Sequence, residues 1–221
     1  MKMGNLAALI TVAAIGAWSQ GQNLLVNPSF EDPQVDASLG YAGAYTAGAT
    51  IGSGWVVEST DFGAFVIADY YTAGGVTWAD PTDGNQFLYV GTNATSSTIY
   101  QDVALQGSTR HVLSFDLAEF LSGYFASSGA YLLVDVLQNG TSILGGAVPF
   151  TRPIGADFAT QTLEFTTQDS GEYRLWLRNG GGYGTNVDNF SLTAVPAPGA
   201  AIAIATTVLT MGLRRRRSVV R

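Results

Sequence analysis

The sequence predicts an all-β protein built as a single jelly-roll β-sandwich. Apolar and polar residues alternate over many short stretches, and Gly, Asn, Asp and Pro interrupt these stretches. Between the two ends of the chain, no long stretch has helical spacing. About 180 of the 221 residues remain once two apolar ends are set aside, which is enough for one domain with a buried core.

The first 19 residues have the layout of a signal peptide. Lys2 precedes an apolar stretch at 6–17, and Ala17 and Ser19 place small residues before a cut ahead of Gln20. We therefore expect a signal helix at 1–19 that signal peptidase removes on export. A buried N-terminal helix is the alternative.

Strand patterns and turn residues alternate through the exported part, 20–194. The expected strands are 23–26, 54–59, 64–71, 86–90, 98–105, 111–120, 130–138, 141–144, 159–166, 173–178 and 187–193. Asn139 and Gly140 stand between two apolar stretches and predict a two-residue hairpin, because both turn positions need a positive φ. The Gly-rich stretches 36–54 and 122–129 are expected to be long loops, where ligands often bind.

Charge and composition argue against several functions. The stretch 20–198 holds four arginines and all 17 acidic residues, whereas nucleic-acid binding needs a basic surface, so we expect no nucleic-acid partner. The chain has no cysteine and one histidine, His111, which shares its strand face with Leu113 and Phe115 and is expected in the core. Because neither a nucleophilic triad nor a Gly-x-Ser-x-Gly elbow can be assembled, we predict that the protein is not an enzyme. Glycosidase chemistry, which needs only two carboxylates, stays open as a less favoured alternative.

Aromatic residues in or beside the expected loops are the candidate ligand contacts, because aromatic rings pack against the apolar faces of sugars. The predicted ligand-binding residues are Tyr41, Tyr45, Tyr70, Tyr71, Trp78, Tyr124 and Tyr183. For each of them plain packing is the alternative. Trp55 and Trp176 fall within expected strands and are assigned to the core. A structural surface or matrix protein without a small ligand is the alternative to a binding function.

Residues 195–221 form a separate tail. A Pro-x-Pro box comes first and consists of Val195, Pro196, Ala197 and Pro198. After an apolar stretch at 199–213 comes a basic cluster, which consists of Arg214, Arg215, Arg216 and Arg217. At about 1.5 Å per residue the apolar stretch gives a helix of roughly 22 Å, a marginal membrane span, and the arginines favour the cytoplasmic side.

This tail resembles the PEP-CTERM sorting signal, which exosortase-type membrane proteases recognise. Ala197 stands where the family box has Glu. The resemblance implies an inner-membrane intermediate, cleavage by an exosortase-type protease, and a final place at the cell surface or outside the cell. A plain C-terminal membrane anchor is the alternative.

The exported part resembles the galactose-binding-like jelly rolls of carbohydrate-binding modules. The segments that carry the resemblance are 23–31, 83–89, 99–103, 113–118 and 187–192. His111 departs from it, because the family usually has a tyrosine four residues before the position of Phe115. The resemblance implies non-catalytic binding of an extracellular polysaccharide.

The same resemblance implies that the first and closing strands lie side by side, which would bring Glu31 and Asp188 together. Calcium takes six to eight oxygen ligands, so a structural calcium ion is predicted there, with backbone carbonyls and Asn27 or Asn189 completing its shell. The alternative is that Asp188 caps a turn and that Glu31 is solvated.

Overall fold

A computed structural model describes residues 21–36, 38–59, 64–68, 71, 77–91, 97–121, 129–181 and 184–196. Gly21–Val195 forms one compact unit. Over the described ranges the regular elements are all strands, and none of these residues belongs to a helix long and apolar enough to cross a membrane. The expected signal helix and the expected C-terminal helix lie outside the described residues.

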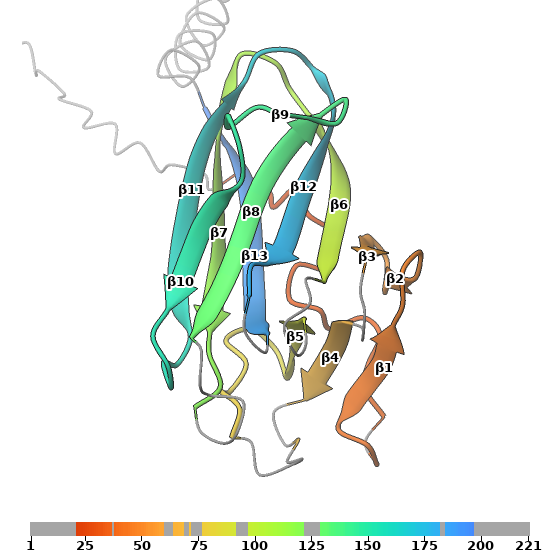
Figure 1. Cartoon of the computed structure of the whole chain (residues 1–221). Helices are drawn as coiled ribbons and strands as arrows, with labels where there is room; N and C mark the ends of the chain where they lie inside the picture. The colour runs from red at the N-terminus through yellow and green to blue at the C-terminus, as the bar shows by residue number, and fades with distance from the viewer. Residues whose placement is uncertain are drawn as a thin grey trace, which may run out of the picture. The chain divides into compact units, whose positions relative to one another are not determined.

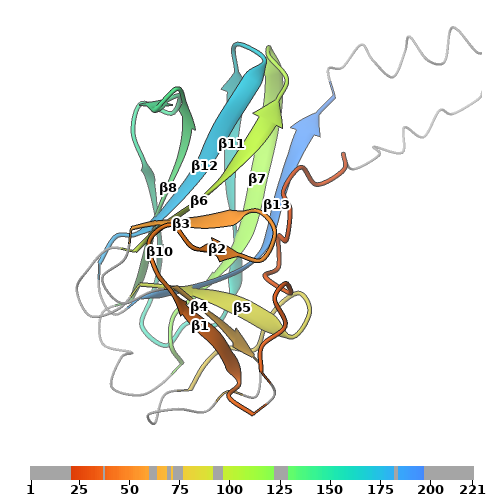
Figure 2. The ribbon, with the colours of Figure 1, turned by 90° about the vertical axis from the view of Figure 1, so that its right-hand side faces the viewer.

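Two antiparallel sheets pack face to face as a sandwich, which confirms the predicted fold class (Figure 1, and Figure 2 after a quarter turn). The six-stranded sheet has the order β1 (Tyr41–Tyr45), β4 (Ala64–Ala68), β5 (Gln86–Val90), β13 (Thr185–Val195), β7 (Thr109–Ala118) and β11 (Ala159–Thr167). The seven-stranded sheet has the order β10 (Val148–Arg152), β8 (Ala130–Gln138), β12 (Gly171–Asn179), β6 (Thr98–Leu105), β3 (Trp55–Ser59) and β2 (Thr50–Ile51), with β9 (Thr141–Ser142) paired to β8.

The core lies between the sheets and is filled by alternate residues of their strands. Its centre is aromatic: Phe115 stacks on Phe190 at 5.1 Å between ring centroids, and Trp55 meets Phe190 edge to face at 5.4 Å. Trp55 is fully buried, as predicted. His111 is 1% exposed and stacks on Phe165, so its assignment to the core is also confirmed.

The expected first strand, 23–26, is not a strand, although it does lie along β13. The N–H of Leu24 donates to the carbonyl of Leu192, while the Asn23 side chain accepts from the N–H of Leu192 and donates to the carbonyl of Phe190. One asparagine side chain thus replaces part of the backbone ladder that a strand would make.

Three further strands differ from expectation. The stretch 36–54, expected to be a loop, contains β1 and β2, and β10 was not predicted. β10 ends its sheet and carries Pro149, a residue that sheets accept at their edges. The predicted hairpin is confirmed, with φ of 51° at Asn139 and 76° at Gly140.

Candidate functional site

The outer face of the seven-stranded sheet, called the open face below, carries an accessible tryptophan. Along β12 the side chains of Tyr173, Leu175 and Leu177 are buried, so Arg174 and Trp176 point to the opposite side. The assignment of Trp176 to the core is therefore wrong. Membership of a strand does not decide burial; the position along its two-residue period does.

A polar network joins three strands on the open face. Arg174 on β12 makes a bidentate ion pair with Asp102 on β6, at 2.8 and 3.0 Å, and its guanidinium carbon lies 3.5 Å from the ring centroid of Tyr100. Glu58 on β3 accepts from Arg174 at 3.4 Å and from the indole N–H of Trp176 at 2.8 Å. The hydrogen bond to Asp102, with smaller effects of the nearby negative groups, raises the pKa of Arg174.

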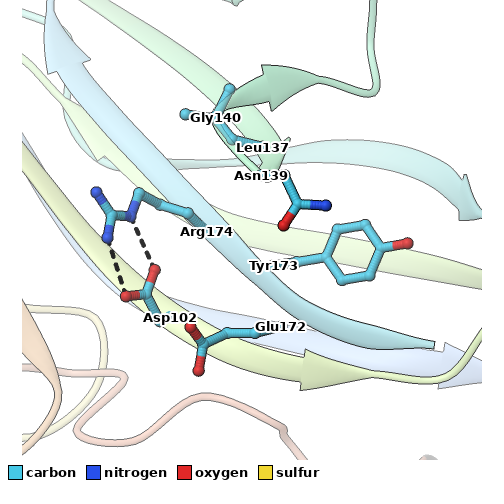
Figure 3. Close-up of a pocket in the computed structure, with 7 residues that line it drawn as sticks. All are labelled: Asp102, Leu137, Asn139, Gly140, Glu172, Tyr173 and Arg174. Atoms are coloured by element: carbon cyan, nitrogen blue, oxygen red, sulfur yellow. Dashed lines mark hydrogen bonds and ion pairs between the residues drawn. The ribbon is translucent and has the colours of Figure 1, made fainter. Parts of the chain in front are cut away.

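A pocket of about 260 Å³ adjoins this network (Figure 3). Its lining residues are Asp102, Leu137, Asn139, Gly140, Glu172, Tyr173 and Arg174. The turn of the confirmed hairpin forms one side, and the Asp102–Arg174 ion pair lies on another (Figure 3). The pocket thus offers carboxylate and amide groups beside a short apolar surface, the mixture that polar small-molecule sites use.

A second cluster of aromatic rings lies away from the main core. This aromatic cluster consists of buried Ile67, Phe87, Tyr89 and Phe120 with half-buried Tyr41, Phe65, Tyr71, Trp78 and Phe158. Trp78 is central, with ring centroids 4.7 Å from Phe120 and 5.5 Å from Tyr89. The N–H of Leu121 donates to the carbonyl of Thr77 and so fixes Trp78 beside Phe120.

Glu119 lies next to this cluster and is 1% exposed. Burial raises the pKa of its carboxyl to about 7, and the backbone N–H of Phe120 opposes this shift. The negative charge of Glu119 in turn adds to the effect of burial in raising the pKa of Tyr89. Burial thus outweighs the Phe120 N–H, and the protonated form of the Glu119 carboxyl is favoured.

Several buried polar groups near the same strand ends lack partners within the described part of the chain. They are the indole N–H of Trp78, the hydroxyl of Thr185 and both amide atoms of Asn186. Asn186 pairs in register with Ala118 and Tyr89, which places it beside the start of the Glu119 segment. Unpartnered buried polar groups are rare in folded proteins, which makes this end of the sheet unusual.

Glu31 and Asp188 both bind one turn, Thr82–Gln86, through its backbone N–H groups. Asp188 accepts from the N–H groups of Thr82 and Asp83 at 2.7 and 3.1 Å, and Glu31 accepts from those of Asn85 and Gln86, both at 2.8 Å. Burial raises the pKa of Asp188 to about 7, and these backbone hydrogen bonds oppose the shift. Within the described ranges no group of three or more His, Cys, Asp or Glu side chains is arranged to hold a metal ion.

The structure brings three of the seven predicted ligand residues together. The ring centroids of Tyr41 and Tyr71 lie 5.3 Å apart, and those of Tyr71 and Trp78 lie 6.0 Å apart. All three rings belong to the aromatic cluster rather than to an open platform. Tyr45 packs against the main core. The remaining three, Tyr70, Tyr124 and Tyr183, lie outside the described residues.

The sequence interpretation missed Glu58, Arg174 and Glu119. The alternation along 173–178 was enough to place Arg174 and Trp176 on one face. No local pattern distinguished Glu58 or Glu119 from the other acidic residues, because their environments are set by strands distant in sequence.

Comparison with known proteins gives one family and a fold. A family model described as "HpiC1-like: HpiC1 cyclase" matches residues 22–193. No curated protein matches the chain. Among solved structures, TmCBM61 in complex with β-1,4-galactotriose superposes with a TM-score of 0.51 at 15% identity, covering 79% of this chain and 99% of that one. The CBM22-1 xylan-binding domain of Xyn10C from Paenibacillus barcinonensis gives a TM-score of 0.47 at 16% identity, over 80% and 97% of the two chains.

These matches correct one prediction. The expectation that the protein is not an enzyme is wrong, because the matching family is named for a cyclase. That expectation rested on the absence of a nucleophilic triad and of a Gly-x-Ser-x-Gly elbow. A carboxylic acid can act as a general acid without either of them.

Proposed function

We propose that this chain, which belongs to the HpiC1-like family, uses its open face to bind an extracellular polysaccharide. The observation that carries the proposal is the half-buried indole of Trp176, which Glu58 fixes on the same face as Arg174, a residue that lines the pocket of Figure 3. An exposed aromatic ring binds the apolar side of a sugar ring, and the surrounding carboxylate and amide groups accept and donate hydrogen bonds to its hydroxyls.

Charge and fold support a neutral or cationic polymer. Asp102, Glu172 and Glu58 outnumber Arg174 around the pocket and network, so an anionic polymer would be repelled. The fold is also shared with TmCBM61, whose solved structure holds β-1,4-galactotriose.

Affinity electrophoresis tests the proposal. In gels that contain galactan, xylan, glucan or chitosan, the full chain should be retarded by at least one polymer. Trp176→Ala should reduce the retardation about tenfold or more, because it removes the central aromatic contact. Leu39→Ala, which removes an exposed apolar side chain before β1, is the matched control. Unchanged migration across the panel would favour the structural surface or matrix protein instead.

A second candidate function is a proton-initiated cyclisation at Glu119. The specific observation is the buried carboxyl of Glu119, which has a pKa of about 7 and contributes to raising the pKa of Tyr89 in the aromatic cluster. A carboxylic acid that stays protonated near neutral pH is a general acid, and aromatic faces stabilise cations. The family name gives this candidate its reaction class.

The chemistry balances without an oxidant or a cofactor. The Glu119 O–H gives its proton to one carbon of an alkene, which leaves a cation on the neighbouring carbon. A second π bond of the same substrate attacks that cation, so a carbon–carbon bond closes the ring. Ring closure leaves the positive charge on the other carbon of that second π bond. A C–H next to this new cation then gives its proton to the Glu119 carboxylate, and the product is an isomer of the substrate.

Deuterium labelling tests this candidate. In D2O the full chain is incubated with a panel of acyclic polyenes and alkenyl arenes, and products are analysed by mass spectrometry. We expect a cyclic isomer that carries one deuterium, and a loss of about 100-fold or more in Glu119→Gln, which lacks the acidic proton. Glu164→Gln, at an exposed ion pair on β11, is the control. A fully active Glu119→Gln enzyme would contradict the role.

The proposal extends to export and sorting. The signal-peptide layout of 1–19 and the tail at 195–221 support passage through the inner membrane, cleavage by signal peptidase and an exosortase-type protease, and a place at the cell surface or outside the cell. The two candidate functions use different parts of the domain, so one does not exclude the other.

A further inference from the structure

We propose that Glu58 is a positioning residue that holds the open face ready for its ligand. This inference rests on the proposed ligand-binding function of that face. It concerns a residue that need not touch the ligand itself, and it follows from the backbone of β3 and from the two hydrogen bonds that the Glu58 carboxylate accepts.

A β-bulge supplies the first observation. In the pairing of β3 with β6, Val57 lies opposite Ile99 and Ser59 lies opposite Thr98, so Glu58 is the extra residue of an irregular register. A bulge changes the direction of the side chain at that position, and bulges are common beside functional sites.

The reach of the side chain supplies the second observation. β3 and β12 are not neighbours, because β6 lies between them. The Glu58 carboxylate nevertheless accepts from the indole N–H of Trp176 with one oxygen and from Arg174 with the other, at 2.8 and 3.4 Å. One carboxylate therefore fixes the indole ring and links it to the guanidinium that Asp102 already holds.

Arg174 determines which surface is left for a ligand. Its guanidinium lies over one face of the Tyr100 ring and is also bound to Asp102 on β6. We therefore take the half-buried Trp176 ring, with the half-buried Arg174 beside it, as the platform for a ligand. A preformed platform loses little side-chain freedom on binding, so its affinity depends on the groups that hold it in place.

The experiment compares Glu58→Ala, Glu58→Gln and Trp176→Ala in the full chain, with Glu164→Ala as the matched control, because Glu164 is also an exposed carboxylate in an arginine pair. Affinity for the polysaccharide that retards the wild type is measured by gel retardation. Acrylamide quenching of tryptophan fluorescence, taken as the difference from Trp176→Ala, reports the freedom of the indole without any ligand.

We expect Glu58→Ala to bind about tenfold more weakly and to increase the quenching of Trp176, at an unchanged melting temperature. Glu58→Gln keeps an acceptor for the indole N–H, so its affinity and its quenching should lie between those of Glu58→Ala and those of the wild type. Wild-type affinity and quenching in Glu58→Ala, with binding lost in Trp176→Ala, would overturn the positioning role and leave the binding face intact. Wild-type affinity in Trp176→Ala would instead overturn the proposed binding face.

Discussion

Two buried carboxyls, Glu119 and Asp188, share a raised pKa of about 7 but differ in their surroundings. Asp188 accepts hydrogen bonds from the backbone of the Thr82 turn, so its oxygens are occupied. Glu119 is buried, and the Phe120 N–H is the group that opposes its raised pKa. The two carboxyls therefore differ in how many backbone N–H groups stabilise their ionised forms.

The raised pKa of Glu119 predicts a pH dependence of stability. The folded state keeps its proton up to about pH 7, whereas the unfolded carboxyl releases it near 4.5. The folded protein thus binds more protons between these values, and its free energy of unfolding falls as pH rises through this window. Because Gln cannot ionise, Glu119→Gln should reduce this pH-dependent decrease in the free energy of unfolding by on the order of 3 kcal/mol.

Urea unfolding at pH 5 and pH 8 measures this effect. The difference in unfolding free energy between the two pH values should be smaller in Glu119→Gln than in wild type, while Glu164→Gln, at an exposed site, should match wild type. An equal difference in all three proteins would show that the folded protein holds Glu119 ionised at both pH values.

Some single residues were predictable and others were not. The alternation of apolar residues around His111 was enough to place it in the core, and the same test would have placed Trp176 on the surface had it been applied. Glu58 and Glu119 differ, because a bulge and an aromatic cluster assembled from distant segments define their roles.

At the scale of elements, the Thr82–Gln86 turn tests the predicted calcium. The carboxylates of Glu31 and Asp188 accept hydrogen bonds from N–H groups of this turn. To bind calcium, their oxygens would have to coordinate the ion in place of some of these hydrogen bonds. If it binds there, excess calcium should raise the melting temperature in calorimetry, and chelator should lower it, because a ligand of the folded state stabilises that state. Identical midpoints would remove the site.

Most expected strands are present, short ones such as β3 and β5 as well as long ones. The long strands β6, β7, β8 and β12 were all placed by their alternation. β1 and β2 were missed because Gly and Ala dominate 36–54, and such residues give little side-chain contrast. The expected strand at 23–26 failed for another reason, since Asn23 bonds β13 with its side chain.

For the whole molecule, the tail gives a mass prediction. In a host with a working exosortase, the exported protein should begin near Gln20 and end between Pro196 and Pro198, because the box, apolar stretch and basic cluster occur in the required order. Intact-mass measurement of the exported protein tests this. Recovery of chains that still end at Arg221 would make the tail a simple membrane anchor.

The β-sandwich was predictable from sequence, but the open face was not. Fold class depends on the period of the apolar pattern, which any one strand displays. A binding face depends on which strands are neighbours, and the order β3, β6, β12 is set by long-range pairing that no single segment reveals.

The place of β13 has a mechanical consequence. β13 lies between β5 and β7, and its last residue, Val195, directly precedes the tail. If the tail holds the protein while a polymer pulls on the domain, the force runs along the β13 axis. Backbone hydrogen bonds lie across that axis, so those to β7 are loaded in shear and must break together rather than one after another. If the proposed tail anchors the protein, β13 would therefore carry the load through several hydrogen bonds at once.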